Sequence, residues 1–182
     1  MGNRLSKIVT RTGDTGETGL ATGARLPKTH ARVQAMGEVD ELNCHIGALL
    51  THRLPEAVRA RLEQTQHELF NLGGELALPG QALVRDADVA ALDAALEALN
   101  ASLPPLKEFV LPGGSPACAQ AHLARAVARR AERALWLLHA QEALAPNPTR
   151  YLNRLSDYLF VCARVLAREA GGEVIWSRTP SS

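Results

Sequence analysis

The sequence has 182 residues, the size of a single domain, and that length can bury a hydrophobic core without disulfides or a structural metal. Its 20 Lys and Arg against 19 Asp and Glu leave a net charge of +1, so no overall field draws it to nucleic acid or an anionic membrane. Its three cysteines lack the close pairs of a zinc site or disulfide framework, and we expect Cys44, Cys118 and Cys162 to be buried in a reducing compartment.

No apolar run follows the first residues, and nowhere do about eighteen apolar residues stand together. We therefore expect a cytoplasmic protein that is not secreted and does not span a membrane.

The first thirty residues lack a helical period and are rich in Gly and Thr, which is typical of a flexible loop that orders around a ligand. Between Thr10 and Leu20 the run combines glycines, hydroxyls and Arg11, the groups that wrap a polyphosphate, and Lys28 could add a cation. It is not a Walker loop, because no Gly-Lys-Ser/Thr follows. An ordinary surface loop is the alternative.

Five segments after this loop carry apolar residues at helical spacing. They run from Ala31 to His52, from Pro55 to Leu78, from a cap at Asp86 or Asp88 to Leu103, from Ala117 to Glu142, and from beyond Pro146–Thr149 to Gly171. The expected core stripe of the fourth consists of Leu123, Val127, Ala131, Ala134 and Leu138. We predict an all-α, single-domain fold, with a five-helix bundle over 31–170 and a C-terminal tail over 171–182.

Three arginines stand four residues apart on the fourth segment: Arg125, Arg129 and Arg133. Like charges at this spacing repel by a few tenths of a kcal/mol per pair unless an anion or carboxylate lies beside them. Trp136 projects on the same side at about 100° per residue, which indicates that this face meets a ligand or another subunit. A solvated face is the alternative interpretation.

The first and fifth segments each carry polar residues beside the core stripe. On the first, Asp40 lies in a strip of small residues with Gly37, Cys44 and Gly47, so it either has a partner across a close contact or is a plain surface acid. On the fifth, Asn153, Asp157 and Arg164 form a polar edge that routine interhelix hydrogen bonds would also explain. We expect four histidines to be exposed or hydrogen-bonded rather than ligands: His45, His67, His122 and His139.

Five motifs together resemble the PduO-type ATP:cob(I)alamin adenosyltransferases. They run, in order, from Thr10 to Gly16, Val39 to Asn43, Phe109 to Gly114, Arg129 to Arg133 and Leu152 to Tyr158. The resemblance implies a homotrimer of five-helix bundles, with ATP and a corrinoid bound between neighbouring subunits. It also implies transfer of the 5′-deoxyadenosyl group of ATP to the cobalt of cob(I)alamin, which yields adenosylcobalamin and triphosphate.

The resemblance assigns ATP binding to residues of the loop and of the fourth and fifth segments. These are Thr10, Arg11, Thr12, Gly13, Thr18, Gly19, Lys28, Arg129, Arg130, Glu132, Arg133 and Asn153. Gly19 departs from the pattern, because several members have a hydroxyl residue there. Mg²⁺ would be bound through the phosphates, and no protein side chain is expected to ligate a metal ion.

The resemblance also implies a catalytic set of Asp40, Phe109, Arg125 and Arg129. Asp40 and Arg125 match a salt bridge across the subunit interface, and Phe109 matches an aromatic that occupies the lower axial side of the cobalt. Filling that side favours four-coordinate Co(II), which is easier to reduce. Because Co(I) is itself the nucleophile, no protein base is needed, and Arg129 and Lys28 would stabilise the leaving triphosphate. From its neighbours alone, Phe109 could instead be a core plug.

A reductase and an adenosylcobalamin-dependent acceptor enzyme are the further partners that this chemistry implies. Two alternatives from other classes stay open: a nucleotide-gated cobalamin carrier or sensor without turnover, and a helical oligomerisation module that has lost both ligands. The intact site residues argue against the module, whereas the release of triphosphate would separate an enzyme from a carrier.

Overall fold

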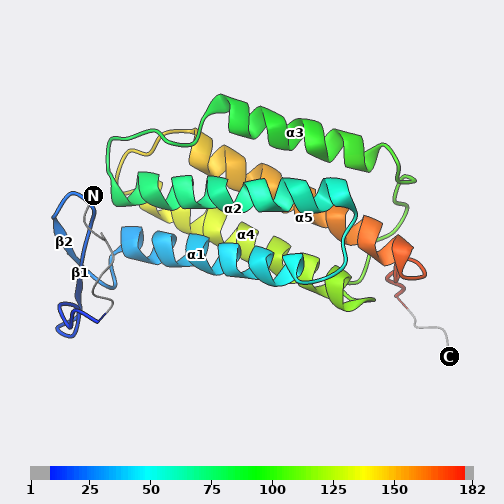
Figure 1. Ribbon diagram of the computed structural model, residues 1–182, viewed down its shortest axis with the longest axis horizontal. Coiled ribbons are helices and arrows are strands. Elements are labelled where there is room, and N and C mark those ends of the chain that lie inside the picture. Colours follow the sequence, from blue (N-terminus) through cyan, green and yellow to red (C-terminus); the bar gives the residue numbers. More distant parts are fainter. Residues whose placement is uncertain (1–8, 179–182) are drawn as a thin grey trace.

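A computed structural model describes residues 9–178, which form five helices and one small hairpin (Figure 1). The strands and helices are β1 (Glu17–Gly19), β2 (Arg25–Pro27), α1 (Ala31–Leu50), α2 (Glu56–Ala77), α3 (Asp86–Asn100), α4 (Pro116–His139) and α5 (Asn147–Glu169). The predicted helical bundle is confirmed. Over this described range, none of the helices has the length and apolar character needed to cross a membrane.

The helix ends follow from local hydrogen bonding. Helix α4 begins one residue earlier than expected, because the Ser115 side chain accepts a hydrogen bond from the Cys118 amide and caps it. The predicted cap of α3 was wrong, since the N-cap is Arg85. Asp88 instead accepts from the Arg85 amide over 2.9 Å, so its carboxylate closes the first turn from inside the helix.

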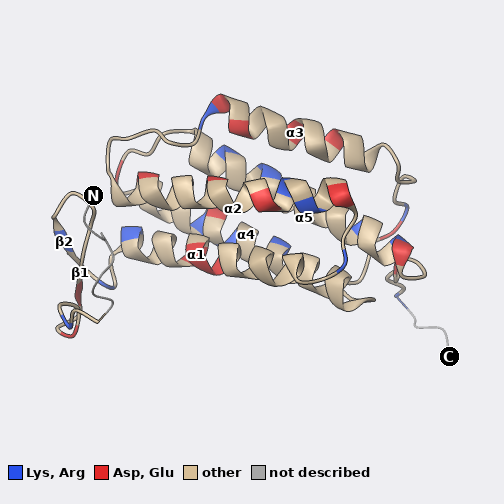
Figure 2. Cartoon of the chain, in the orientation of Figure 1, with Lys and Arg blue, Asp and Glu red and all other residues tan. Residues whose placement is uncertain are grey.

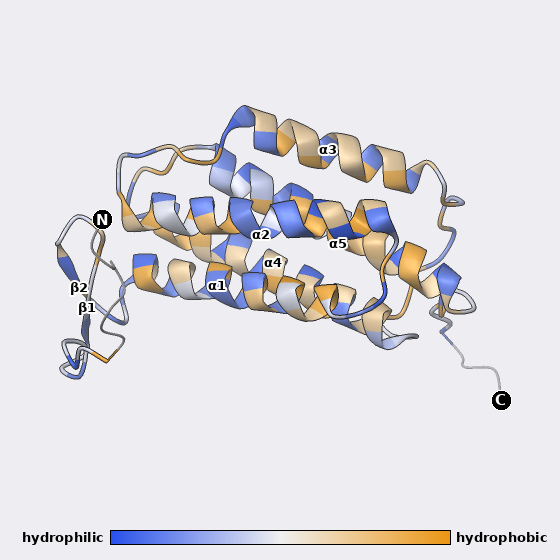
Figure 3. Cartoon of the chain, viewed as in Figure 1, coloured by the Kyte–Doolittle hydropathy of each residue, from blue (hydrophilic) through white to orange (hydrophobic). Residues whose placement is uncertain are grey.

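Helix α1 packs against both α2 and α4, α4 packs against α5, and α5 packs against α3. Figure 1 shows α3 along one outer edge of the bundle and α1 along the opposite edge. Figure 3 shows apolar and polar residues on different faces of the helices, as amphipathic packing requires. Helix α3 carries only acidic charges (Figure 2), and Asp93 on it forms an ion pair with Arg154 of α5. That pair joins the outermost helix to the bundle.

The inward face of α4 consists mainly of alanines, among them Ala121, Ala124, Ala128 and Ala131. These small residues let α4 lie close to both α1 and α5. The expectation that Leu123 belongs to this stripe was wrong, since its side chain is 53% exposed. The other expected members, Val127, Ala131, Ala134 and Leu138, are buried. Alanine gives a weak hydrophobic signal, so the sequence pattern selected Leu123 in place of the buried Ala124.

The loop before α1 contains a hairpin that the sequence did not predict. Strands β1 and β2 pair antiparallel with Thr18 opposite Leu26, and the Ala21 amide donates to the Ala77 carbonyl of α2 over 3.2 Å. Each strand has three residues, which is too short for an alternating pattern to be visible in the sequence. Figure 1 shows the hairpin at the end of the bundle where α1 begins. The residues before Val9 lie outside the described part of the chain.

Candidate active site

The loop that precedes α1 brings a lysine over a glycine backbone. A Cβ added at Gly13 would lie 3.2 Å from Lys28 Nζ, so the missing side chain makes room for the ammonium group. The Lys28 amide also donates to the Gly16 carbonyl over 2.8 Å. A cation above an exposed, glycine-rich backbone is an arrangement that binds phosphate groups.

The rest of the loop is supported from the hairpin. Arg25 donates to the Thr12 carbonyl over 2.8 Å and forms an ion pair of 3.3 Å with Glu17. The Thr10 and Thr12 hydroxyls lie 3.0 Å apart, and Arg11 between them has a φ of 59°, in the left-handed region that non-glycine residues seldom adopt. Among the predicted loop residues, Thr10 lies beside Thr12 and Gly13 beside Lys28, whereas Thr18 and Gly19 lie in β1.

Helix α4 separates its arginines into two groups. Arg129 and Arg133 are exposed and form no ion pair within residues 9–178. Arg130, between them in the predicted ATP set, is held by Glu38 at 2.5 Å and by Glu41, both on α1. These hydrogen bonds hold the pKa of Arg130 above its ordinary value. Two cations on this face thus remain available to an anionic ligand, and the third ties α4 to α1.

A cavity of about 330 Å³ lies between the end of α4 and the start of α5. Glu132, Trp136 and Asn153 line it, and the Asn153 amide donates to Glu132 over 3.5 Å. The Trp136 ring lies edge-on to His139, with centroids 5.6 Å apart. The structure therefore joins two predicted nucleotide-binding residues, Glu132 and Asn153, to an aromatic surface.

A second cavity, of about 570 Å³, brings Phe109 and Arg125 together although they come from a loop and a helix. The Phe109 ring is 79% exposed, so it does not fill the core. Burial of the Arg125 guanidinium, together with repulsion from Arg129, holds the pKa of Arg125 below its ordinary value. Its Nε is buried without a hydrogen-bond partner among the described residues.

The sequence interpretation missed His122, which also lines this cavity. The ring is 4% exposed, packs edge-on against Phe160 at 6.2 Å, and finds no hydrogen-bond partner for either nitrogen in the described range. Our expectation of an exposed or hydrogen-bonded side chain was therefore wrong. Burial, and then the charge of Arg125, lower the pKa of His122 and keep the imidazole neutral. Its position three residues before Arg125, on the same helix face, was the available signal.

Asp40 lies elsewhere, in a groove of about 540 Å³ between α1 and α2. Gly37, Phe70 and Gly73 line the same groove, and the Phe70 side chain is 73% exposed. Asp40 forms no ion pair with any residue in the range 9–178, Arg125 included. Cys44 is exposed, so the expectation that all three cysteines are buried was wrong for this one.

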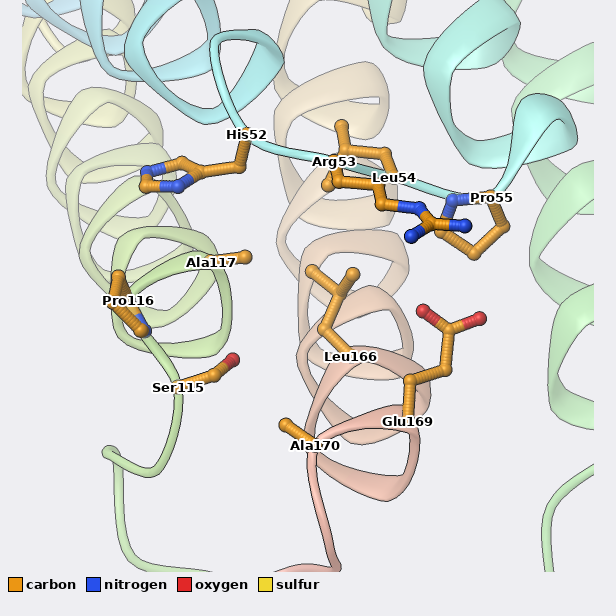
Figure 4. Close-up of a pocket in the computed structure, with 10 residues that line it drawn as sticks. All are labelled: His52, Arg53, Leu54, Pro55, Ser115, Pro116, Ala117, Leu166, Glu169 and Ala170. Atoms are coloured by element: carbon orange, nitrogen blue, oxygen red, sulfur yellow. The ribbon is translucent and has the colours of Figure 1, made fainter.

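A further cavity of about 600 Å³ lies where α1 leads into α2 (Figure 4). His52 and Arg53 approach it from the α1–α2 connection, Ser115 from the start of α4 and Glu169 from the end of α5 (Figure 4). None of the predicted site residues lines it. Size alone therefore does not select the functional cavity in this chain.

Comparison with known proteins identifies the family. A family model described as cobalamin adenosyltransferase matches residues 8–166. The chain belongs to the cobalamin adenosyltransferase family. It is 60% identical to a cobalamin adenosyltransferase of Cupriavidus metallidurans over the whole of both chains. It is 41% identical to a corrinoid adenosyltransferase of Bacillus subtilis, with 95% of this chain and 93% of that protein covered.

The relationship extends to solved structures. A Phe-to-Ala variant of the PduO-type ATP:corrinoid adenosyltransferase of Lactobacillus reuteri, complexed with cobalamin and ATP, superposes with a TM-score of 0.88. It is 31% identical, and the match covers 95% of this chain and 100% of that one. An Arg-to-Lys variant complexed with ATP has a TM-score of 0.85 at the same identity, with 94% of this chain and 100% of that one covered.

Proposed function

We propose that this protein transfers the 5′-deoxyadenosyl group of ATP to the cobalt of a reduced corrinoid such as cob(I)alamin. The observation that carries the proposal is that Phe109 and Arg125 line one cavity, in a chain whose family and structural relatives act on corrinoids. Co(I) attacks C5′ of ATP, so a cobalt–carbon bond forms as the C5′–O5′ bond breaks. Triphosphate leaves with the electron pair, and the cobalt is oxidised to Co(III).

The protein must then align cobalt with C5′ and stabilise the charge that grows on triphosphate. Lys28 above Gly13 supplies positive charge for the phosphates, together with Arg129 and Arg133, which have no ion pair among the described residues. The cavity that Glu132 and Asn153 line would receive the nucleoside. These assignments need no protein nucleophile or base.

We infer that Mg²⁺ enters this site bound to the phosphates of ATP. Within residues 9–178 no group of three or more His, Cys, Asp and Glu side chains is placed to hold a metal. Mg²⁺ keeps several waters and is commonly bound through phosphates with few protein ligands. When bound, it would neutralise part of the triphosphate charge.

A homotrimer would complete the site. Asp40 and Arg125 do not pair within the chain, although each carries a charge beside a cavity. A neighbouring copy could bring its Asp40 groove, with the exposed Phe70, against the Arg125 face. Light scattering should give about three times the chain mass of 19.5 kDa. A monomer mass at micromolar concentration would contradict the shared site.

The proposed chemistry implies a reductase that supplies the reduced corrinoid and an adenosylcobalamin-dependent enzyme that accepts the product, and we place this protein with them in the cytoplasm. The decisive experiment mixes the protein with ATP, Mg²⁺ and chemically reduced cobalamin. We expect the adenosylcobalamin spectrum and one triphosphate per product. A nucleotide-gated carrier would bind cobalamin and release no triphosphate, and that result would replace the enzyme assignment.

A further inference from the structure

The C-terminal segment after α5 pairs with the loop that carries Phe109. Val110 and Ile175 form an isolated antiparallel bridge. On one side of it the Leu111 amide donates to the Val174 carbonyl over 2.8 Å, and on the other the Trp176 amide donates to the Phe109 carbonyl over 2.7 Å. The backbone of Phe109 is therefore tied to the tail by a short β-ladder.

The same ladder places an aromatic ring beside Phe109. The Trp176 ring lies edge-on to the Phe109 ring, with centroids 6.5 Å apart and an interplanar angle of 76°. This T-shaped arrangement is a favourable geometry for two aromatic rings. Because most of the Phe109 ring is exposed, Trp176 is one of the few groups that restrict where it points.

A buried ion pair anchors both partners to α5. Arg164, which is buried on α5, donates from Nε to Glu173 over 2.6 Å and from Nη2 to the Pro104 carbonyl over 2.8 Å. Arg168 lies 3.8 Å from the other Glu173 oxygen. One guanidinium therefore holds the start of the Phe109 loop and the start of the ladder strand. Breaking a buried pair leaves an uncompensated charge, so this anchor is costly to open.

We propose that residues 173–176, which we call the C-terminal clamp, hold Phe109 in its cavity, and that Trp176 is the positioning residue. The inference rests on the proposed corrinoid function, because it concerns the ring expected beside the cobalt. A clamp of this kind explains how a ring on a proline- and glycine-rich loop keeps a fixed direction without burial in the core. Trp176 acts through Phe109 rather than on the substrate.

The test compares Trp176→Ala with the conservative Trp176→Phe and with Ile175→Ala. Adjacent residues in a strand point to opposite faces, so Ile175→Ala alters the same segment and leaves both rings in place. With ATP and Co(II) cobalamin bound, we expect Trp176→Ala to lose most of the four-coordinate signal in electron paramagnetic resonance. Its kcat with a mild reductant should fall about tenfold to a hundredfold, the scale of a small misplacement at a reacting centre.

Three features separate positioning from a structural role. With free Co(I) supplied, Trp176→Ala should keep most of the wild-type kcat, KM for ATP should be unchanged, and Trp176→Phe should restore the four-coordinate signal. Glu173→Gln, which loosens the anchor and keeps both rings, should reproduce the spectral loss. A Trp176→Ala protein with the wild-type spectrum would overturn the clamp and leave the enzyme assignment intact. A wild type that makes no adenosylcobalamin would remove the proposed function, and the clamp's role with it.

Discussion

Arg130 on α4 donates from Nε to Glu38 on α1 over 2.5 Å, and the contact joins two neighbouring helices of the bundle. Glu38 is buried, and the Gln34 side chain donates to its other oxygen over 2.7 Å. The neighbouring Arg129 has no ion pair within residues 9–178. Adjacent arginines of one motif therefore have different environments, and their substitutions should have different effects.

Arg130→Ala should lower stability, because it leaves the carboxylate of Glu38 buried without its cation. An unsatisfied buried group of this kind costs about 1–3 kcal/mol. Urea unfolding measures the change. Arg133→Ala is the matched control, since Arg133 is exposed without an ion pair in the described range and should leave stability nearly unchanged. Equal unfolding curves for the two variants would show that the Glu38 contact contributes nothing.

Arg129→Ala should bind cobalamin nearly normally and lose about 10²–10³ in turnover, the usual cost of removing one preorganised donor to a developing charge. Steady-state production of adenosylcobalamin at saturating ATP measures it. Arg53→Ala removes an exposed arginine from the separate cavity of Figure 4 and should keep wild-type turnover. If Arg129→Ala also retains full turnover, Arg129 has no part in the reaction.

The helices could be predicted where leucines carry the period. The leucines that recur at helical spacing along α2 are buried, as Leu62, Leu69 and Leu76 illustrate. Leu123 was misplaced because the buried face of α4 is built from alanines, which a pattern of large apolar residues does not reveal. The hairpin was missed because each strand has only three residues.

The site could be predicted less completely, because its parts meet only in three dimensions. Motif matching selected Phe109 and Arg125, but only the fold places them in one cavity. His122 and Phe160 line that cavity too. Neither was selected, since His122 was expected to be exposed or hydrogen-bonded and Phe160 lies outside the five motifs. The contact between Phe109 and Trp176 depends on a ladder between distant segments, which no local pattern encodes.

Asp40→Asn should reduce activity through the proposed contact between subunits, because it leaves Arg125 opposite a neutral group. Breaking a fully buried pair costs about 3–5 kcal/mol, and less where water reaches it. Activity and unfolding measurements on Asp40→Asn, Arg125→Ala and the double variant form a cycle. The double variant should lose less than the sum of the single losses. Strict additivity would show that the two residues do not meet in the assembly.

Stability should fall as the pH drops below about 6.5, because His122 is held neutral in the folded chain. The pKa of His122 is lowered by burial and by Arg125, whereas the unfolded histidine takes up a proton near its ordinary value. The unfolded state then binds more protons, so the free energy of unfolding falls toward acid by up to about 1.4 kcal/mol per pH unit.

Urea unfolding at pH 7.5 and 5.5 measures this change, which should be smaller in His122→Phe. The control is His67→Gln at an exposed position, and this variant should lose as much stability toward acid as the wild type does. Identical pH profiles for His122→Phe and wild type would show that His122 titrates normally.

Phe109→Ala should leave the stability of the fold nearly unchanged and alter the coordination of the cobalt. A ring that filled the core would cost about 3–5 kcal/mol on truncation, but Phe109 is largely exposed and its ring contact is with Trp176 at the surface. The melting temperature should therefore stay close to that of the wild type. With ATP bound, the variant should keep Co(II) cobalamin five-coordinate, because the lower axial side is no longer filled. Turnover should fall most when a mild reductant must generate Co(I) on the protein, and much less when free Co(I) is supplied.

Electron paramagnetic resonance distinguishes the four-coordinate and five-coordinate states of Co(II) directly. A variant that retains the wild-type four-coordinate signal would refute axial displacement by Phe109, and a strongly lowered melting temperature would mean that the ring supports the fold instead.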